Sequence, residues 1–399
     1  MIPPAVEIQV ISHYYTMERG IYEHSEAFAS ISEYPGFGTL MQIALIGFSN
    51  AGKTTVFNAL TGLTVETTAY PTISGEPHRG VVKVPDPRLD MISGIFKPRK
   101  TVHAHVEYLD SVGITRGDRE QNRKVFELIR DADAIVHVVR AFQDESVLHP
   151  LESIDPVRDT EMMELELILG DLAFVEKRLG RMEDGVKRGK KPDESEMRLL
   201  LKCSESLNRE IPLRKVAFSQ DDLLAMRHLQ FLSIKPMVVV LNIAEADLHL
   251  DNTQALCSVL AEKYPKTPLV VLSGKIEMEI ARLSPDDARL FIEDLALENP
   301  ASHKLVTLCY ETLGLISFFT YAGSEVRSWA VRKGTIAQKA AGKVHSDIER
   351  GFIRAEVISY DGFIAAGNIQ TAREKGLLRL EGKTYEVRDG DIINFRFNV

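Results

Sequence analysis

Short apolar runs that end at a polar residue or a glycine recur along the chain from Met41 onward. Runs of this kind predict strands buried inside the sheet of an α/β protein. A helical pattern over 56–60 follows the first run, so the chain begins its folded part as strand, loop and helix. The predicted buried strands lie at 41–46, 106–109, 237–241 and 270–272.

Residues 159–209 follow a helical pattern instead, because apolar side chains recur there at steps of three and four. Two such helices, joined over 185–192, predict an antiparallel hairpin inserted between the strands. The first helix is expected to present one apolar face made of Met162, Leu165, Leu169, Leu172, Val175 and Leu179. The second is expected to do so with Met197, Leu200, Leu201 and Leu207.

The two ends of the chain differ from this middle part. Residues 1–40 show no sustained period and are expected to be an extension, either a disordered tail or a stretch that precedes a natural start at Met41. From about 316 to 399 the pattern changes to short strands and glycine turns, which predicts a separate C-terminal module. Strands are expected over 380–385 and 385–395.

Composition excludes several classes of protein. The chain has 399 residues, 44% hydrophobic and 26% charged, which is typical of a globular protein with two or three domains. No apolar run approaches the roughly 18–20 residues that span a bilayer, so we expect no membrane partner. Three cysteines without CxxC spacing argue against a disulfide framework or a zinc site and favour the cytoplasm. The net charge of −9 means that any RNA contact needs a local basic cluster.

The segment Gly47–Thr54 matches the phosphate-binding pattern GxxxxGK[ST] and stands between the first predicted strand and helix. Its glycines allow the backbone N–H groups to point toward one anion, and the helix adds its positive N-terminal end. Lys53 is expected to reach the β- and γ-phosphates, the Thr54 hydroxyl to bind Mg²⁺, and Thr55 to contact the α-phosphate. The candidate residues are Ser49, Asn50, Ala51, Gly52, Lys53, Thr54 and Thr55.

A second phosphate-site pattern, DxxG, follows the strand at 106–109. We expect Asp110 to lie near Mg²⁺, behind its direct ligands, and the Gly113 amide to sense the γ-phosphate. Thr72, between the two patterns, is a candidate switch residue that binds Mg²⁺ only with a triphosphate present. That assignment rests on sequence order and on resemblance, because any loop threonine fits the description.

Base recognition is predicted at the ends of the last two buried strands. GTPases use NKxD there, with the aspartate accepting hydrogen bonds from guanine, whereas this chain reads Asn242-Ile243-Ala244-Glu245. The longer carboxylate of Glu245 should weaken the recognition of guanine. The loop that closes over the base is expected at Ser273, Gly274 and Lys275.

From Met41 to Val399 the chain resembles the Obg-like ATPase (YchF) family, through the segments 80–89, 137–142, 155–159, 351–356 and 395–399. The resemblance implies a Mg²⁺-dependent, ATP-preferring P-loop hydrolase that associates with ribosomes. It implies a G-domain-like mixed sheet over 41–315, the helical hairpin inserted at 159–209, and a ubiquitin-like α+β TGS domain at 316–399. Lys53, Thr72 and Gly113 would then carry the hydrolysis, and a monomer is expected.

The chain departs from the family directly after DxxG. Where the family has a glycine-rich stretch, this chain reads Ile-Thr-Arg-Gly-Asp-Arg-Glu-Gln-Asn-Arg over 114–123. Gln121 carries an amide close to this point, and we interpret it as a solvated helix residue. The departure predicts slow hydrolysis or a switch coupled to another signal. Two alternatives stay open: a GTPase of the Obg class, and a nucleotide-binding ribosome or RNA adaptor with little hydrolysis.

Two basic clusters are candidates for ribosome or ribosomal RNA contact. Segment 324–354 has seven basic and three acidic residues, a formal charge of +4. A solvated surface explains it equally simply, and His345 within it is expected to be a structural hydrogen-bonding residue. The other cluster is the hairpin tip, Lys187, Arg188, Lys190 and Lys191.

Overall fold

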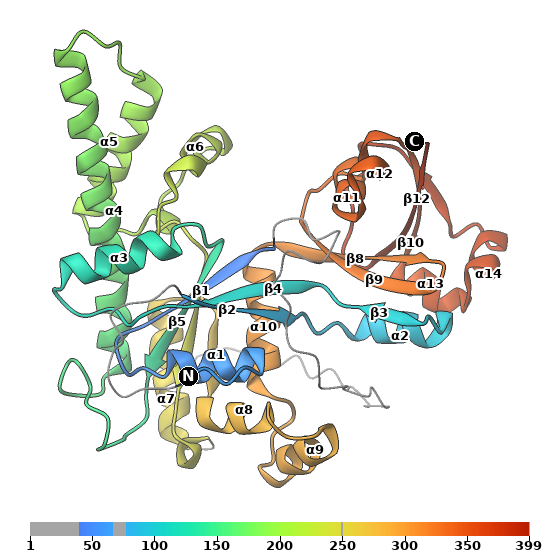
Figure 1. The fold of residues 1–399 in the computed structure, drawn as a ribbon, viewed down its shortest axis with the longest axis horizontal. Coiled ribbons are helices and arrows are strands. Elements are labelled where there is room, and N and C mark those ends of the chain that lie inside the picture. The colour runs from blue at the N-terminus through green and yellow to red at the C-terminus, as the bar shows by residue number, and fades with distance from the viewer. Residues whose placement is uncertain (1–39, 67–76, 249, 399) are drawn as a thin grey trace, which may run out of the picture.

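The computed structural model describes residues 40–66, 77–248 and 250–398, which form two six-stranded sheets and a projecting pair of helices (Figure 1). The strand order of the first sheet is β2-β4-β1-β5-β6-β7, in which β2 is antiparallel to its neighbour and the other strands are parallel. Its strands are β1 (Gln42–Ile46), β2 (His78–Lys83), β4 (His105–Asp110), β5 (Ala134–Arg140), β6 (Met237–Asn242) and β7 (Leu269–Leu272).

Helices cover both faces of this sheet. On one face, α1 (Lys53–Thr61) and α10 (Ala301–Thr312) pack on the strands, and α8 (Gly274–Ile280) and then α9 (Pro285–Asp294) follow beside α1. On the other face lie α3 (Arg119–Ile129), α7 (Asp251–Lys263) and the first turns of α4 (Pro156–Lys187). The parallel strands β1, β5 and β6 are buried on both faces, which explains their continuous apolar sequences.

The predicted hairpin is formed by α4 (Pro156–Lys187) and α5 (Glu194–Asn208), which extend away from the sheet in Figure 1. The expected apolar face was partly wrong. Leu169 is 42% exposed, because the buried face of α4 is formed by Met163, Leu167 and Ile168. Leu201 is 53% exposed, because α5 buries Leu200, Cys203 and Leu207 instead. The chain returns to the sheet through η2 (Leu213–Lys215), α6 (Gln220–Met226) and η3 (Arg227–Leu229).

The C-terminal part forms the second sheet, with strand order β11-β10-β12-β8-β9-β3. Helices α11 (Ala337–Val344) and α12 (Ser346–Arg350) cover one face, and α13 (Tyr360–Ala366) and α14 (Ile369–Glu374) lie on the other. The strands from this part of the chain are β8 (Leu315–Ala322), β9 (Glu325–Arg332), β10 (Phe352–Ser359), β11 (Arg379–Glu381) and β12 (Asp391–Phe397). The expected strands over 380–395 were too long, because 382–390 is a turn-rich connection.

The sixth strand of the second sheet comes from the first part of the chain. Helix α2 (Pro87–Phe96) and strand β3 (Lys100–Val102) cross to the C-terminal part, where β3 pairs in parallel with β9. Arg88 fixes this crossing, because its guanidinium donates to Asp389 at 2.7 and 3.2 Å. Leu89 and Ile92 are fully buried in the C-terminal core.

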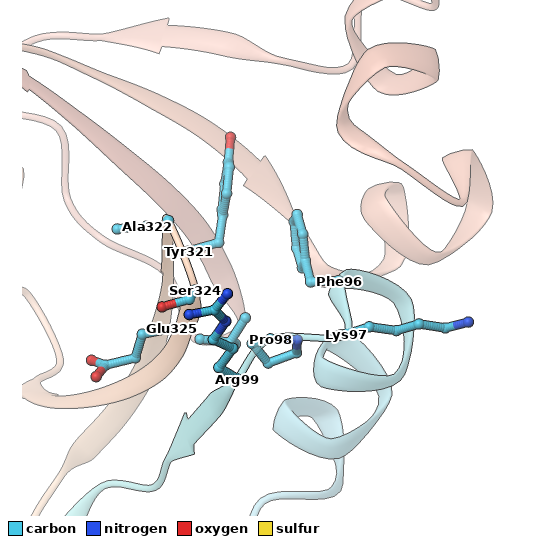
Figure 2. Close-up of a pocket in the computed structure, with 10 residues that line it drawn as sticks. Phe96, Lys97, Pro98, Arg99, Tyr321, Ala322, Ser324 and Glu325 are labelled. Atoms are coloured by element: carbon cyan, nitrogen blue, oxygen red, sulfur yellow. The ribbon is translucent and has the colours of Figure 1, made fainter.

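A small open pocket of about 240 Å³ marks the end of this crossing. Figure 2 shows Phe96 and Tyr321 side by side above Pro98 and Arg99, and the two rings stack with centroids 4.7 Å apart. Among residues 40–66, 77–248 and 250–398, no helix is long and apolar enough to cross a membrane.

Candidate nucleotide-binding site

The loop between β1 and α1 has the geometry that the phosphate-binding pattern predicts. Asn50 and Gly52 both have positive φ, 64° and 86°, so the loop turns back on itself before α1 begins at Lys53. A Cβ on Gly47 would lie 2.4 Å from the Val138 carbonyl oxygen, and one on Gly52 would lie 2.2 Å from Nδ2 of Asn242. Glycine is therefore required at both positions, and the N-terminal end of α1 points into the loop.

Lys53 is buried inside this loop. It is 7% exposed, and its ammonium donates to the Phe48 carbonyl oxygen at 3.2 Å. Burial lowers the pKa of Lys53 to about 8, and the nearby charge of Asp110 opposes that effect. A buried cation with so few partners is well suited to receive an anionic phosphate.

Thr54 and Asp110 meet at the mouth of the loop, where the Thr54 hydroxyl donates to Oδ2 of Asp110 at 2.8 Å. The other carboxylate oxygen of Asp110 is buried and has no hydrogen-bond partner among the described residues. Burial raises the pKa of Asp110, against the effects of the Thr54 hydrogen bond and the Lys53 charge. A hydroxyl and a carboxylate are the hard oxygen donors that Mg²⁺ prefers.

Gly113 lies directly against the phosphate loop. A Cβ there would come within 2.6 Å of the Ser49 Cα atom, so only glycine fits. The next residue joins the loop as well, because the Ser49 amide donates to the Ile114 carbonyl oxygen at 3.3 Å. The Ser49 hydroxyl is buried and has no partner in the part of the chain that the structure describes. Thr72, the candidate switch residue, lies outside the described residues.

The predicted base-recognition residues divide into two groups. Asn242 is buried, and its side chain donates to the Ala51 carbonyl oxygen at 3.0 Å and accepts from the Gly274 amide at 2.9 Å. It therefore joins the phosphate loop to the 273–275 loop, a role that the pattern alone did not indicate. Ile243 and Ser273 are also buried, whereas Glu245, at the start of η4 (Glu245–Asp247), and Lys275 are exposed. Thr55 lies beside this junction, because a Cβ added to Gly274 would lie 3.4 Å from the Thr55 methyl group.

Sequence reasoning missed the segment after β5, which packs on the phosphate loop. The Asn50 side chain donates to the Leu148 carbonyl oxygen at 3.0 Å, and the Phe142 ring lies 3.9 Å from a Cβ on Gly52. Arg140 organises this segment: the residue is 2% exposed, and its guanidinium donates to the carbonyl oxygens of Phe142, Asp144 and Val147. The signal was an arginine that ends a fully buried strand.

The two basic clusters differ in how many of their charges are already paired. In segment 324–354, Arg327, Arg332, Lys339 and Arg350 form ion pairs within the chain. His345 caps α12 by accepting from the Asp347 amide at 3.1 Å, the structural role expected for it. The hairpin tip is more open, since its one ion pair among the described residues is the exposed contact of Lys187 with Asp184 at 3.5 Å.

The parallel sheet, the phosphate loop that leads into α1, and the approach of Asp110 and Gly113 to that loop define a P-loop NTPase of the G-domain class. Two family models match the chain: MMR_HSR1, described as a 50S ribosome-binding GTPase, over residues 42–168, and YchF-GTPase_C, described as a protein of unknown function, over 315–398.

Similar proteins extend over nearly the whole chain. The ribosome-binding ATPase YchF of Bacillus subtilis (strain 168) is 38% identical, covering 89% of this chain and 98% of the relative. The protein of the same name from Escherichia coli O157:H7 is 36% identical over the same shares. The solved Schizosaccharomyces pombe YchF GTPase is 27% identical with a TM-score of 0.76, covering 90% and 98% of the two chains. This chain belongs to the YchF family, so the predicted resemblance is confirmed.

Proposed function

We propose that this chain binds ATP with Mg²⁺ at the phosphate loop, hydrolyses it slowly, and acts in the cytoplasm as a ribosome-associated switch. The observation that carries the proposal is the arrangement of Lys53, Thr54 and Asp110 around a loop that is already formed. Relatives named ribosome-binding ATPase support the activity and the partner.

The phosphates are bound by charge and by backbone amides. The loop Ser49–Gly52 surrounds the β-phosphate, to which the N–H groups of Asn50 and Gly52 donate. The N–H groups of Ser49 and Ala51 hold the loop in shape by donating to the carbonyl oxygens of Ile114 and Phe48. Lys53 bridges the β- and γ-phosphates, and Thr55 contacts the α-phosphate. Thr54, backed by Asp110, would hold Mg²⁺, with Thr72 as a further ligand in the triphosphate state. When bound, the ion neutralises charge on the β- and γ-phosphate oxygens.

Hydrolysis in this proposal depends on positioning and charge stabilisation. The Gly113 amide donates to the γ-phosphate, and Lys53 stabilises the charge that develops as the phosphoryl group leaves. Glu245, with Asn242, Ile243 and the loop Ser273–Lys275, gives the base site its preference for ATP over GTP. Glu245 is exposed, so its side chain can extend toward a bound base. The length of that side chain then determines which base it contacts.

Ribosome contact is proposed for the hairpin tip and the C-terminal module, with the chain acting as a monomer. The tip lies at the end of two helices that project from the nucleotide-binding sheet (Figure 1). Its exposed lysines and arginine match the phosphates of an RNA helix. Helix α4 connects the hairpin tip to the nucleotide-binding sheet. Residues near its start lie in the hydrophobic core of that sheet, and residues at its end form the tip.

Paired titrations with ATP and with GTP, each with Mg²⁺ and followed by phosphate release, test the proposal. Tighter binding of ATP and a slow release of phosphate are expected. Preference for GTP would contradict the role of Glu245 and favour an Obg-class GTPase. Binding of ATP without phosphate release would favour the adaptor, which the hydrogen-bonded segment after Gly113 also favours.

A further inference from the structure

Side chains from two helices fix the segment that follows Gly113. A short connection leads from Gly113 to α3, which Asp118 caps by accepting from the Gln121 amide at 3.0 Å. Gln121, predicted as a solvated helix residue, lies in that helix but is only partly exposed. Its side-chain amide donates to the Gly113 carbonyl oxygen at 3.2 Å.

Asn122 is more deeply buried than Gln121. It is 2% exposed and occupies the buried face of α3 together with Val125, Phe126 and Ile129. Its Oδ1 accepts from the Thr115 amide at 3.0 Å, and its Nδ2 donates to the Thr115 carbonyl oxygen at 2.8 Å. One side chain therefore holds both polar groups of a single backbone residue, two positions after Gly113.

The hairpin takes part through Glu166, which lies on α4. Oε2 of Glu166 accepts from Nδ2 of Asn122 at 2.9 Å, and its other oxygen is 3.5 Å from the Gly117 amide. On the opposite side, the Ile114 amide donates to the Gly47 carbonyl oxygen at 3.0 Å. The connection is thus tied to the phosphate loop at one side and to the hairpin helix at the other.

We propose that Gln121, Asn122 and Glu166, here called the switch clamp, are positioning residues that hold the Gly113 amide in its γ-phosphate-binding place before a triphosphate arrives. The proposal rests on the proposed nucleotide binding at the phosphate loop. Ordering a flexible segment costs conformational entropy at each residue, and a segment that is already held avoids that cost on binding. The switch clamp therefore strengthens triphosphate binding more than diphosphate binding.

The same contacts connect the nucleotide site to the hairpin. Because Glu166 belongs to α4, a displacement of that helix by a bound partner changes the position of Asn122 and then of Gly113. Coupling of this kind is reciprocal: a triphosphate that favours the clamped arrangement also favours the hairpin position that goes with it. The connection between Gly113 and α3 is therefore held in a position that depends on the hairpin.

The test compares affinities for ADP and for a non-hydrolysable ATP analogue, both with Mg²⁺, by calorimetric titration of the full chain. In Asn122→Ala and in Glu166→Ala we expect the analogue to bind about tenfold more weakly, which corresponds to about 1.4 kcal/mol. ADP should stay within about twofold of wild type. Glu166→Gln keeps an acceptor oxygen for Asn122 and should retain most of the affinity. Glu176→Ala, an exposed change on the same helix, is the control.

Each outcome is decisive. Loss of affinity for the ATP analogue alone supports the switch clamp. Because Glu166 is only half-buried, the Glu166 variants still test the proposal if Asn122→Ala does not fold. An equal loss for both nucleotides, or no loss for either, overturns the inference and leaves the proposed nucleotide binding intact. A wild-type chain that binds neither nucleotide overturns the proposed function together with the inference.

Discussion

Replacing Lys53 by methionine should make the nucleotide-free chain more stable while it removes nucleotide binding. The lysine is 7% exposed, and its ammonium donates to the Phe48 carbonyl oxygen. Because that contact does not replace the lost hydration, the pKa falls from 10.5 to about 8. This fall corresponds to about 3 kcal/mol, at roughly 1.4 kcal/mol for each tenfold change in ionisation.

Part of that gain is lost, because the carboxylate of Asp110 no longer has a positive neighbour in the variant. We therefore expect Lys53→Met to raise the local free energy of unfolding by about 1–3 kcal/mol at pH 7. Methionine has a similar length and no charge, so it fills the same space without a buried ammonium.

The dependence on pH gives an internal check. The folded-state pKa of about 8 is below the unfolded value of 10.5, so the unfolded chain binds the extra proton between them. The wild-type penalty is fully present below about pH 8 and disappears as the pH approaches 10.5. The advantage of the variant should therefore shrink over that interval. Nucleotide affinity of the wild type should fall as the pH rises above about 8, because neutral Lys53 attracts phosphate less.

Hydrogen–deuterium exchange of the amides in β1 and α1 measures this local stability without nucleotide. The single tryptophan, Trp329, lies in β9 and reports on the other sheet, so its fluorescence is the wrong probe. Lys304→Met, an exposed change in α10, is the control. A wild-type chain as stable as Lys53→Met at pH 7 would refute the cost of burial. Undiminished ATP binding by the variant would refute the assignment of the phosphate loop.

Two further predictions concern the parts outside the nucleotide site. Arg88→Ala should destabilise the C-terminal sheet by about 2–3 kcal/mol, because it removes the exposed hydrogen bonds to Asp389 and leaves the buried carboxylate of Asp86 without its guanidinium partner. Thermal unfolding measures this loss of stability. The control is Arg79→Ala, which removes the ion pair of the half-exposed Arg79 with Glu107, and an equal loss of stability in the two variants would contradict the prediction. Reversing two charges of the hairpin-tip cluster should weaken co-sedimentation with ribosomes, most clearly at low salt. The matched control is Arg282→Glu with Arg289→Glu, which reverses two exposed arginines elsewhere on the chain. If this control weakens co-sedimentation equally, the hairpin tip is excluded as the ribosome-binding surface.

The sequence was sufficient for the features whose signals are local. The strands β1, β6 and β7 were predicted because their apolar runs are continuous, and β4 because a single glutamate, Glu107, interrupts its apolar run. The phosphate loop was predicted because its glycines stand at fixed spacing. The hairpin was predicted from its helical period, but Leu169 and Leu201 were assigned to the wrong face. A long helix with apolar residues on several sides does not specify which side its neighbours cover.

Features that depend on distant segments could not be predicted. The pairing of β3 with β9 joins residues far apart in sequence, and nothing near Lys100–Val102 indicates its partner. Asn242 was assigned to base recognition, yet its amide joins two loops, which only their proximity in space shows. Asn122 gave a usable signal, because a polar residue stands among the apolar positions of an amphipathic helix. Such a residue is expected to be buried with its hydrogen bonds satisfied.

The crossing of α2 and β3 into the second sheet has a consequence for biosynthesis. At about 5–20 residues per second, the roughly 220 residues between β3 and β9 take about 11–44 s to be made. During that time the side chains of Leu89 and Ile92, which end in the C-terminal core, have no cover. The nascent chain thus exposes the apolar side chains of α2, which a chaperone can bind. Conversely, a fragment over 315–398 made alone lacks its edge strand β3 and the cover that α2 gives to its core, so we expect a fragment that includes residues 87–102 to be more stable.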